Sequence, residues 1–117
     1  MKETEEYYQE EDLERETLID TDVFIRGKLN IHTPLRIKGK IEGDIISDNN
    51  IIIEKEGKVY GNIEARQVII AGYIEGDVTG YEKVAILKTG VLKGDIKTAK
   101  LKIADGVIFE GSCKMLT

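Results

Sequence analysis

A seven-residue pattern returns four times along the chain and constrains its fold more than any other feature. The copies read GKIEGDI from Gly39, GKVYGNI from Gly57, GYIEGDV from Gly72 and GVLKGDI from Gly90. Each copy holds two glycines four residues apart, with aliphatic residues at fixed positions between and after them. A pattern that recurs every 15 to 18 residues in this way indicates stacked structural repeats and not an ordinary globular domain.

Aliphatic residues alternate with polar ones from Leu18 onward, and this period of two is typical of β-strands. Successive copies start at Leu35, Ile51, Val68, Val84 and Leu101, which are 16, 17, 16 and 17 residues apart. The polar connections between copies, at residues 47–50, 64–67, 80–83 and 97–100, are far shorter than the dozen or so residues of a helical crossover. Parallel strands joined by such short connections pair only if the chain coils. The sequence therefore predicts an all-β fold, a parallel β-helix of about six short coils over residues 18–114.

Laying the copies under one another predicts which side chains fill the interior. One inward column reads Ile41, Val59, Ile74, Leu92 and Ile108, and another reads Ile45, Ile63, Val78, Ile96 and Cys113. Two glycine columns mark the corners, where a residue without a Cβ lets the chain bend and the coils approach closely. They are Gly39, Gly57, Gly72, Gly90 and Gly106, and Gly43, Gly61, Gly76, Gly94 and Gly111. Because Gly106 and Gly111 are five residues apart, we expect Phe109 to be pushed out of the inward pattern.

Charge divides the chain into an acidic N-terminal part and a nearly neutral repeat body. Residues 1–17 carry eight acidic and two basic side chains, whereas residues 18–117 carry fourteen and fifteen. Few apolar residues and a high net charge predict a disordered tail over residues 1–17, followed by the β-helix and a short C-terminal end at 115–117. An acidic tail is repelled by anionic lipid, so we do not expect it to bind a membrane directly.

Several classes of location and partner do not fit the sequence. Cys113 is the only cysteine, which is compatible with a reducing compartment and excludes a disulfide or a Cys-based zinc site within one chain. We see neither an apolar run near the roughly 20 residues of a membrane span nor a secretory signal, and we expect a cytoplasmic location. Lysines are scattered without interleaved aromatics, so nucleic acid is not an expected partner.

No residue set predicts catalysis, a cofactor or a metal. The polar column Asp44, Asn62, Asp77, Asp95 and Ser112 repeats only one of the oxygen positions of calcium-binding β-rolls, which favours a solvated face or side-chain hydrogen bonds along the stack. The only histidine, His32, lies in a turn without a nameable partner for general-base chemistry. Turns of 16 or 17 residues also lack the strict six-residue phase of hexapeptide acyltransferases. The glycines do not lead into a helix, as a phosphate-binding loop would.

The repeats over about residues 18–114, together with the ending GVIFEGSCKM from Gly106, resemble the bactofilins, bacterial cytoskeletal proteins. The resemblance implies a right-handed β-helix that polymerises end to end, without nucleotide, into nonpolar filaments. It also implies a scaffold for cell shape, cell-wall enzymes or polar organisation, associated with the inner face of the cytoplasmic membrane through partners. Some bactofilins carry an apolar membrane-targeting segment at the N-terminus, which this acidic tail lacks. The C-terminal domain of a bacterial division inhibitor looks similar, so the alternative is a non-polymerising adaptor that binds a division or cell-wall protein along its side faces.

A β-helix leaves unpaired backbone groups and an uncapped core at both tips, so its tips are the expected sites of self-association. Candidate end-contact residues are Phe109, Ile108, Met115 and Leu116 at one tip and Val23, Phe24 and Ile25 at the other. For Phe109 the alternative is a local bulge that lies on its own coil. Ile52, Ile69 and Ala85 form a candidate lateral contact that points outward. The alternative is that the chain entering the first coil covers these three residues, so that they contact no other molecule.

Overall fold

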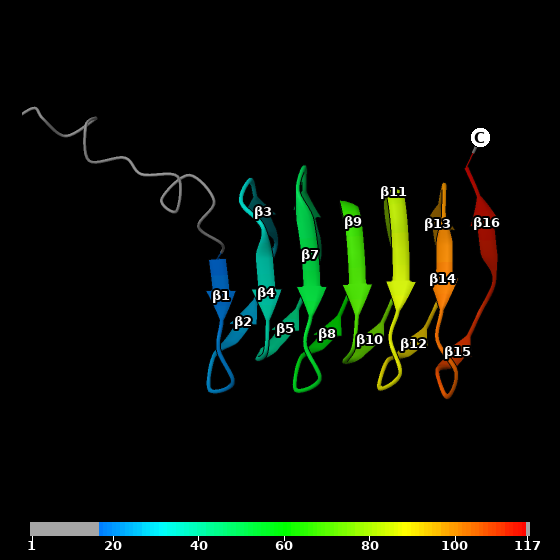
Figure 1. Cartoon of the computed structure of the whole chain (residues 1–117). Coiled ribbons are helices and arrows are strands. Elements are labelled where there is room, and N and C mark those ends of the chain that lie inside the picture. The colour runs from blue at the N-terminus through cyan, green and yellow to red at the C-terminus, as the bar shows by residue number, and fades with distance from the viewer. Residues whose placement is uncertain (1–16, 117) are drawn as a thin grey trace, which may run out of the picture.

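The computed structural model describes residues 17–116, which form sixteen β-strands and, within that range, no helix. The strands stack into a parallel β-helix of about six turns (Figure 1). In this view the strands in front run downward and the chain returns behind them while it advances from left to right. The coil is therefore right-handed, as expected.

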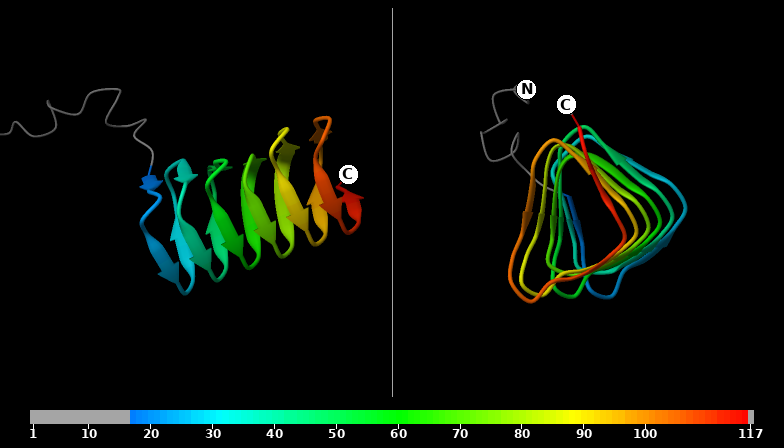
Figure 2. Two further views of the ribbon diagram at one scale, coloured as in Figure 1. Left: turned by 90° about the horizontal axis from the view of Figure 1, so that it is seen from below. Right: turned by 90° about the vertical axis from the view of Figure 1, so that its right-hand side faces the viewer.

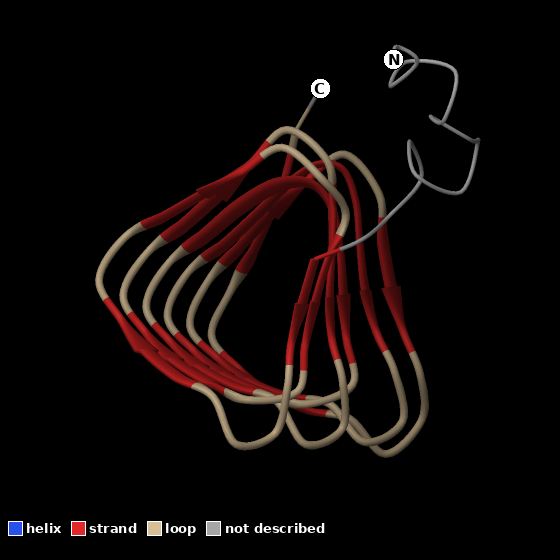
Figure 3. Ribbon diagram, turned by 90° about the vertical axis from the view of Figure 1, so that its left-hand side faces the viewer, coloured by secondary structure: helices blue, strands red, loops and turns tan. Residues whose placement is uncertain are grey.

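Three flat faces give the coil a triangular cross-section (Figures 2 and 3). The first face holds β1 (Thr17–Ile19), β4 (Leu35–Ile37), β7 (Asn50–Ile53), the second half of β9 (Ile63–Ile70), the second half of β11 (Val78–Ile86) and β14 (Leu101–Ile103). The second face holds β2 (Phe24–Arg26), β5 (Lys40–Glu42), β8 (Lys58–Tyr60), β10 (Tyr73–Glu75), β12 (Val91–Lys93) and β15 (Ile108–Glu110). The third face holds β3 (Leu29–Ile31), β6 (Ile45–Ser47), the first halves of β9 and β11, β13 (Ile96–Thr98) and β16 (Cys113–Met115).

Equivalent strands of successive coils pair in parallel. On the second face, Ile41 is in register with Val59, Val59 with Ile74, and Ile74 with Leu92. The first and third faces form one ten-stranded sheet because β9 and β11 run through the corner between them. The predicted connections at residues 64–67 and 80–83 are accordingly parts of continuous strands and not separate loops.

The interior is a dry stack of aliphatic side chains. Ile41, Val59, Ile74 and Leu92 are 0% exposed, and β-branched residues suit the pleated surface on which they lie. Fully burying each such side chain contributes about 1.5–3 kcal/mol. Two buried hydroxyls, on Ser47 and Thr98, accept hydrogen bonds from backbone N–H groups of the following turn, so they do not leave an unsatisfied polar group.

The corner between the second and third faces requires glycine. Gly76 has a φ of 148°, which L side chains rarely adopt, and a Cβ there would overlap the carbonyl oxygen of Gly61. The same geometry recurs in the other coils, so the predicted column Gly43, Gly61, Gly76, Gly94 and Gly111 is confirmed, and Gly27 joins it in the first coil.

In the last coil, the predictions for Gly106, Ile108 and Phe109 are wrong by one residue, whereas Cys113 stands in register with Ile96 as predicted. Leu92 is in register with Phe109, and Val91 with Ile108, so Phe109 continues the inward column and Ile108 points outward. Gly106 does not continue the first glycine column, because Val107 follows the turn at the place that Gly90 holds one coil earlier. The turn from Ile103 to Val107 is as long as the turn from Ile86 to Gly90, so the last coil contains no extra residue. Gly106 lies inside this turn, one position before the corner, and is therefore five residues from Gly111. Gly106 occupies that turn with a φ of 86°.

The described boundaries differ slightly from the predicted ones. Thr17 belongs to β1, and its N–H donates to the carbonyl oxygen of Pro34, so the β-helix begins one residue earlier than expected. The remainder of the predicted disordered tail, residues 1–16, lies outside the described residues. Of the predicted C-terminal end, Met115 completes β16, the N–H of Leu116 donates to the carbonyl oxygen of Thr98, and Thr117 lies outside the described residues.

Replacing a stacked corner glycine should cost more stability than replacing the first glycine of the column. Gly27→Ala introduces only backbone strain, because no atom lies within 4 Å of the position that the alanine Cβ would take, and should cost about 1–3 kcal/mol. Gly76→Ala adds the overlap with Gly61, and we expect a loss of about 4 kcal/mol or more. Urea unfolding followed by circular dichroism measures both. Equal losses for the two variants would contradict close coil stacking at this corner.

Candidate functional site

The N-terminal tip of the β-helix exposes part of its core. Ile25, Leu29 and Ile31 of the first coil are half-buried although they point inward, and Val23 is 37% exposed. The inward residues of the second to fifth coils, by contrast, are almost completely buried. Within the described part of the chain, no further coil covers this tip.

The C-terminal tip is open in the same way. Phe109, Leu101 and Cys113 are half-buried and pack against the core, while the inward-facing Ile103 and Met115 are 47% and 50% exposed. Phe109 ends the inward column that begins at Ile25, so an aromatic side chain stands at this tip.

Each tip also presents free strand edges. Among the described strands, β1, β2 and β3 pair only with strands of the second coil, and β14, β15 and β16 only with strands of the fifth. Their outer edges carry backbone N–H and C=O groups that another strand can pair with. An apolar surface ringed by unpaired strand edges is suited to adding a further coil from another molecule.

The predicted end-contact residues divide into two groups. Val23, Ile25, Phe109 and Met115 lie at the tips, as described above, and half-buried Leu116 follows β16. Phe24 and Ile108 are each 52% exposed and project sideways from the outer surface of the second face. Contact of any of these residues with another molecule stays a prediction.

The second face carries a network of aromatic and charged side chains along the rod. The Lys40 ammonium lies 5.2 Å from the ring centroid of Phe24 and 5.4 Å from that of Tyr60, and the Tyr60 and Tyr73 centroids are 5.7 Å apart. The Tyr73 hydroxyl donates a 2.6 Å hydrogen bond to Glu75, which raises the pKa of Tyr73 to about 12. Tyr73 is therefore a neutral donor at physiological pH, and the side chains of this face bind mainly to one another.

The candidate lateral residues Ile52, Ile69 and Ala85 stand in one outward column of the first face, because β7, β9 and β11 pair in that register. Ile52 and Ile69 are half-buried, and Ala85 is only 6% exposed because taller neighbours flank it. The column is thus a shallow depression in the face and not a ridge.

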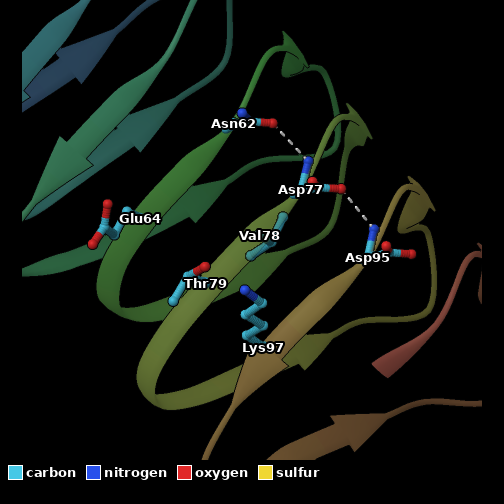
Figure 4. Close-up of a pocket in the computed structure, with 7 residues that line it drawn as sticks. All are labelled: Asn62, Glu64, Asp77, Val78, Thr79, Asp95 and Lys97. Carbon is cyan, nitrogen blue, oxygen red and sulfur yellow. Dashed lines mark hydrogen bonds between the residues drawn. The ribbon is translucent and has the colours of Figure 1, made fainter. Parts of the chain in front are cut away.

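The polar column of the third face forms hydrogen bonds from coil to coil. The Oδ1 atom of Asn62 accepts from the backbone N–H of Asp77, and Oδ1 of Asp77 accepts from the N–H of Asp95, both at 3.0 Å (Figure 4). In the same way, Oδ1 of Asp44 accepts from the N–H of Asn62, and Oδ1 of Asp95 accepts from the N–H of Ser112. Both interpretations left open by the sequence are confirmed, because these side chains are exposed to solvent and also hydrogen-bond along the stack. Among the described residues, no group of three or more potential ligands could hold a metal ion.

His32 forms an exposed hydrogen bond with a carboxylate. Its Nδ1 lies 3.1 Å from Oδ2 of Asp48, and both side chains are about 70% exposed. They line a shallow groove together with Ile46 and Tyr81. The Tyr81 hydroxyl donates to Glu64, which raises the pKa of Tyr81, so this tyrosine is not activated as a nucleophile.

Comparison with known proteins identifies the family. A family model described as "Bactofilin: Polymer-forming cytoskeletal" matches residues 17–114, which is nearly the whole described chain. The chain belongs to the bactofilin family. The bactofilins are a structural family that forms polymers, and self-association into a homopolymer agrees with the open tips.

Solved bactofilin structures share this fold. A cryo-EM reconstruction of Thermus thermophilus bactofilin double helical filaments is 27% identical, with a TM-score of 0.82, and the match covers 86% of this chain and 99% of that chain. A crystal structure of a phenylalanine-to-arginine mutant of Thermus thermophilus bactofilin is also 27% identical, with a TM-score of 0.71 and coverage of 75% and 98%. A search of curated proteins gave no match. No helix within residues 17–116 is long and apolar enough to cross a membrane.

Sequence reasoning missed two features of this bactofilin surface. The cation–π and tyrosine contacts of the second face depend on which residues neighbouring coils bring together, and only the strand register reveals them. The inward position of Phe109 could have been found by counting the turn forward from Ile103, since four residues separate Ile103 from Val107 just as four separate Ile86 from Gly90.

Removing one carboxylate from the third-face column should destabilise the coil stack. Asp77→Ala deletes the acceptor for the N–H of Asp95, and a hydrogen bond to a charged group contributes about 1.5–3 kcal/mol, so an exposed one should contribute about 1 kcal/mol. Asp77→Asn keeps an Oδ1 acceptor, as Asn62 does naturally, and should lose clearly less. Urea unfolding of both variants tests this difference. The interpretation fails if alanine and asparagine have the same effect.

Proposed function

We propose that this bactofilin is a cytoskeletal scaffold whose subunits join end to end, without nucleotide, into filaments that support cell shape, cell-wall or polar organisation. The observation that carries the proposal is the contrast between fully buried inner coils and two tips with exposed core residues and free strand edges. Strand pairing and burial of the core, which stabilise one coil on the next inside the subunit, are equally available between subunits.

The size of the exposed tips is sufficient for stable assembly. If roughly 300–400 Å² of apolar surface per contact leaves water, burial contributes on the order of 8–10 kcal/mol at about 25 cal/mol/Å². Association costs at least about 4 kcal/mol in lost translational and rotational freedom. Backbone hydrogen bonds between the free edges add directionality. Apolar burial less this cost leaves about 4–6 kcal/mol, which corresponds to a Kd of about 40 μM to 1 mM. Several hydrogen bonds between the edges, at about 0.5–1.5 kcal/mol each, bring assembly into the micromolar range.

We place the end contacts at the inward-facing residues of the terminal coils, Phe109 and Met115 at one tip and Val23 and Ile25 at the other. Phe24 and Ile108 lie beside these contacts but point out of the second face, so we place them outside the end contact itself, and Leu116 follows the last strand. Like tips that meet each other give the nonpolar filament implied by the family resemblance. The filaments would lie in the cytoplasm and reach the membrane or cell-wall enzymes through partner proteins.

Phe109→Arg should abolish filaments and leave the coil intact. A guanidinium at the end of the inward column must either be buried uncompensated in the subunit contact or hold the tips apart. Ile108→Arg is the matched control, because Ile108 is adjacent but points out of the second face, and this variant should still form filaments. Negative-stain micrographs and far-UV circular dichroism give the two readouts. Filaments of wild-type length from Phe109→Arg would remove Phe109 from the interface.

Assembly should need no nucleotide, because it depends on apolar burial and strand pairing alone. Purified full-length protein at tens of micromolar should pellet in plain buffer, and added ATP or GTP should leave the pelleted fraction unchanged. Pelleting only with nucleotide would contradict the proposed mechanism. A monodisperse small species under all conditions would instead favour the adaptor that binds a partner along its side faces.

A further inference from the structure

A shallow apolar groove lies on the outer surface of the first face, toward the C-terminal tip. Ile69, Ala85, Leu87, Ile103 and Ala104 line it, and its volume is about 430 Å³. Leu87, in the turn after β11, is 44% exposed, and Ile103, an inward residue of the last coil that the open tip leaves uncovered, is 47% exposed. The groove takes in the C-terminal part of the column Ile52, Ile69 and Ala85.

Lysines border this groove. Lys83 and Lys102 belong to its lining, and Lys100 precedes β14 on the same face. Residues 83–116 as a whole contain seven lysines and three acidic residues. Of those three, Asp95 lies on the third face, Glu110 on the second, and Asp105 in the turn beyond β14, so the strands of the first face carry none of them here.

The N-terminal segment has the complementary composition. Residues 1–16 carry eight acidic and two basic side chains, with Tyr7, Tyr8 and Leu13 as large apolar or aromatic residues. We propose that this segment, residues 1–16 of the chain itself, binds the groove. Its carboxylates would pair with Lys83 and Lys102, and its tyrosines and leucine would cover Leu87 and Ile103.

The segment starts on the correct face and is long enough. Thr17 begins β1, which pairs with β4 on the first face, and the groove lies about four coils further along that face. Four strand spacings amount to about 19 Å. Sixteen extended residues span up to about 53–58 Å. The segment can therefore reach the groove of its own subunit or that of an adjacent subunit.

Charge argues against the rival occupant, a second copy of the chain that stacks groove to groove. Such a symmetric contact would place Lys83 and Lys102 opposite the same lysines of the other copy, and like charges across an interface oppose association. An acidic segment removes this repulsion. The inference does not rest on end-to-end assembly, because the groove opens on the outer surface of the first face, although one of its lining residues, Ile103, also lies at the C-terminal tip.

Zero-length carbodiimide cross-linking of the full-length protein, followed by peptide mass spectrometry, tests the proposal. We expect cross-links from glutamates of residues 1–16 to Lys83 and Lys102, in severalfold excess over Lys58 and Lys97, which are exposed on the other two faces. Their yield should fall severalfold in ~1 M NaCl, where the Debye length is only about 3 Å. Yields that are equal for all four lysines would overturn the proposal.

Charge reversal provides an independent readout with a matched control. Lys83→Glu with Lys102→Glu should increase severalfold the rate at which a glutamate-specific protease cleaves residues 1–16, whereas Lys58→Glu with Lys97→Glu should leave that rate unchanged. Circular dichroism verifies that both variants fold. In a Cys113→Ser background, rapid oxidation of Leu87→Cys to a disulfide-linked dimer would show a second copy in the groove, and would overturn the proposal.

Discussion

Parallel pairing of each coil with the next is the interaction on which the rest of this structure depends. It fixes a strand spacing of about 4.8 Å, and at that spacing only aliphatic side chains stacked in register fill the interior. The same spacing leaves no room for a Cβ where Gly76 meets Gly61. An inner coil satisfies all its backbone groups and buries all its inward residues because it has two neighbours. A terminal coil has only one neighbour, so its outer strand edges lack a partner and its inward side chains stay partly exposed.

The repeat explains why so much of the fold could be predicted from sequence. Ile41, Val59, Ile74 and Leu92 recur at one position of the pattern, and any register other than the observed one would separate them. The prediction failed in the sixth coil, where Gly106 resembles a corner glycine but lies in a turn. Glycine fits both places for different reasons. A Cβ at Gly90 would lie too close to the carbonyl oxygen of Ile70, whereas Gly106 has a φ of 86°, which other residues avoid. Only the pairing of Leu92 with Phe109 decides between them.

The surface was less predictable because its contacts link residues of neighbouring coils that are far apart in sequence, 13 positions for Tyr60 and Tyr73 and 18 for Asp77 and Asp95. Asp77 contacts Asp95, and Tyr60 contacts Tyr73, only through the stacking of coils whose turns differ in length. A column of small polar residues predicts that their side-chain oxygens act as metal ligands or as hydrogen-bond acceptors. Both roles need the same residue types, so the sequence does not decide between them. The direction of each bond, in which the N–H of one coil donates to the side-chain oxygen of the preceding coil, depends on three-dimensional geometry.

These surface contacts also explain why the tips, more than the sides, favour association. Along the second and third faces, polar side chains are paired with neighbours of the same subunit, so a partner would have to displace existing contacts. At the tips, Phe109 and Ile25 lie beside strand edges that have a partner on one side only. The first face is intermediate, with apolar residues in its groove and lysines at the rim. Burying this groove also requires neutralising those lysines, so the first face favours an acidic peptide over another copy of the same face. Growth of the filament therefore remains directed along the axis.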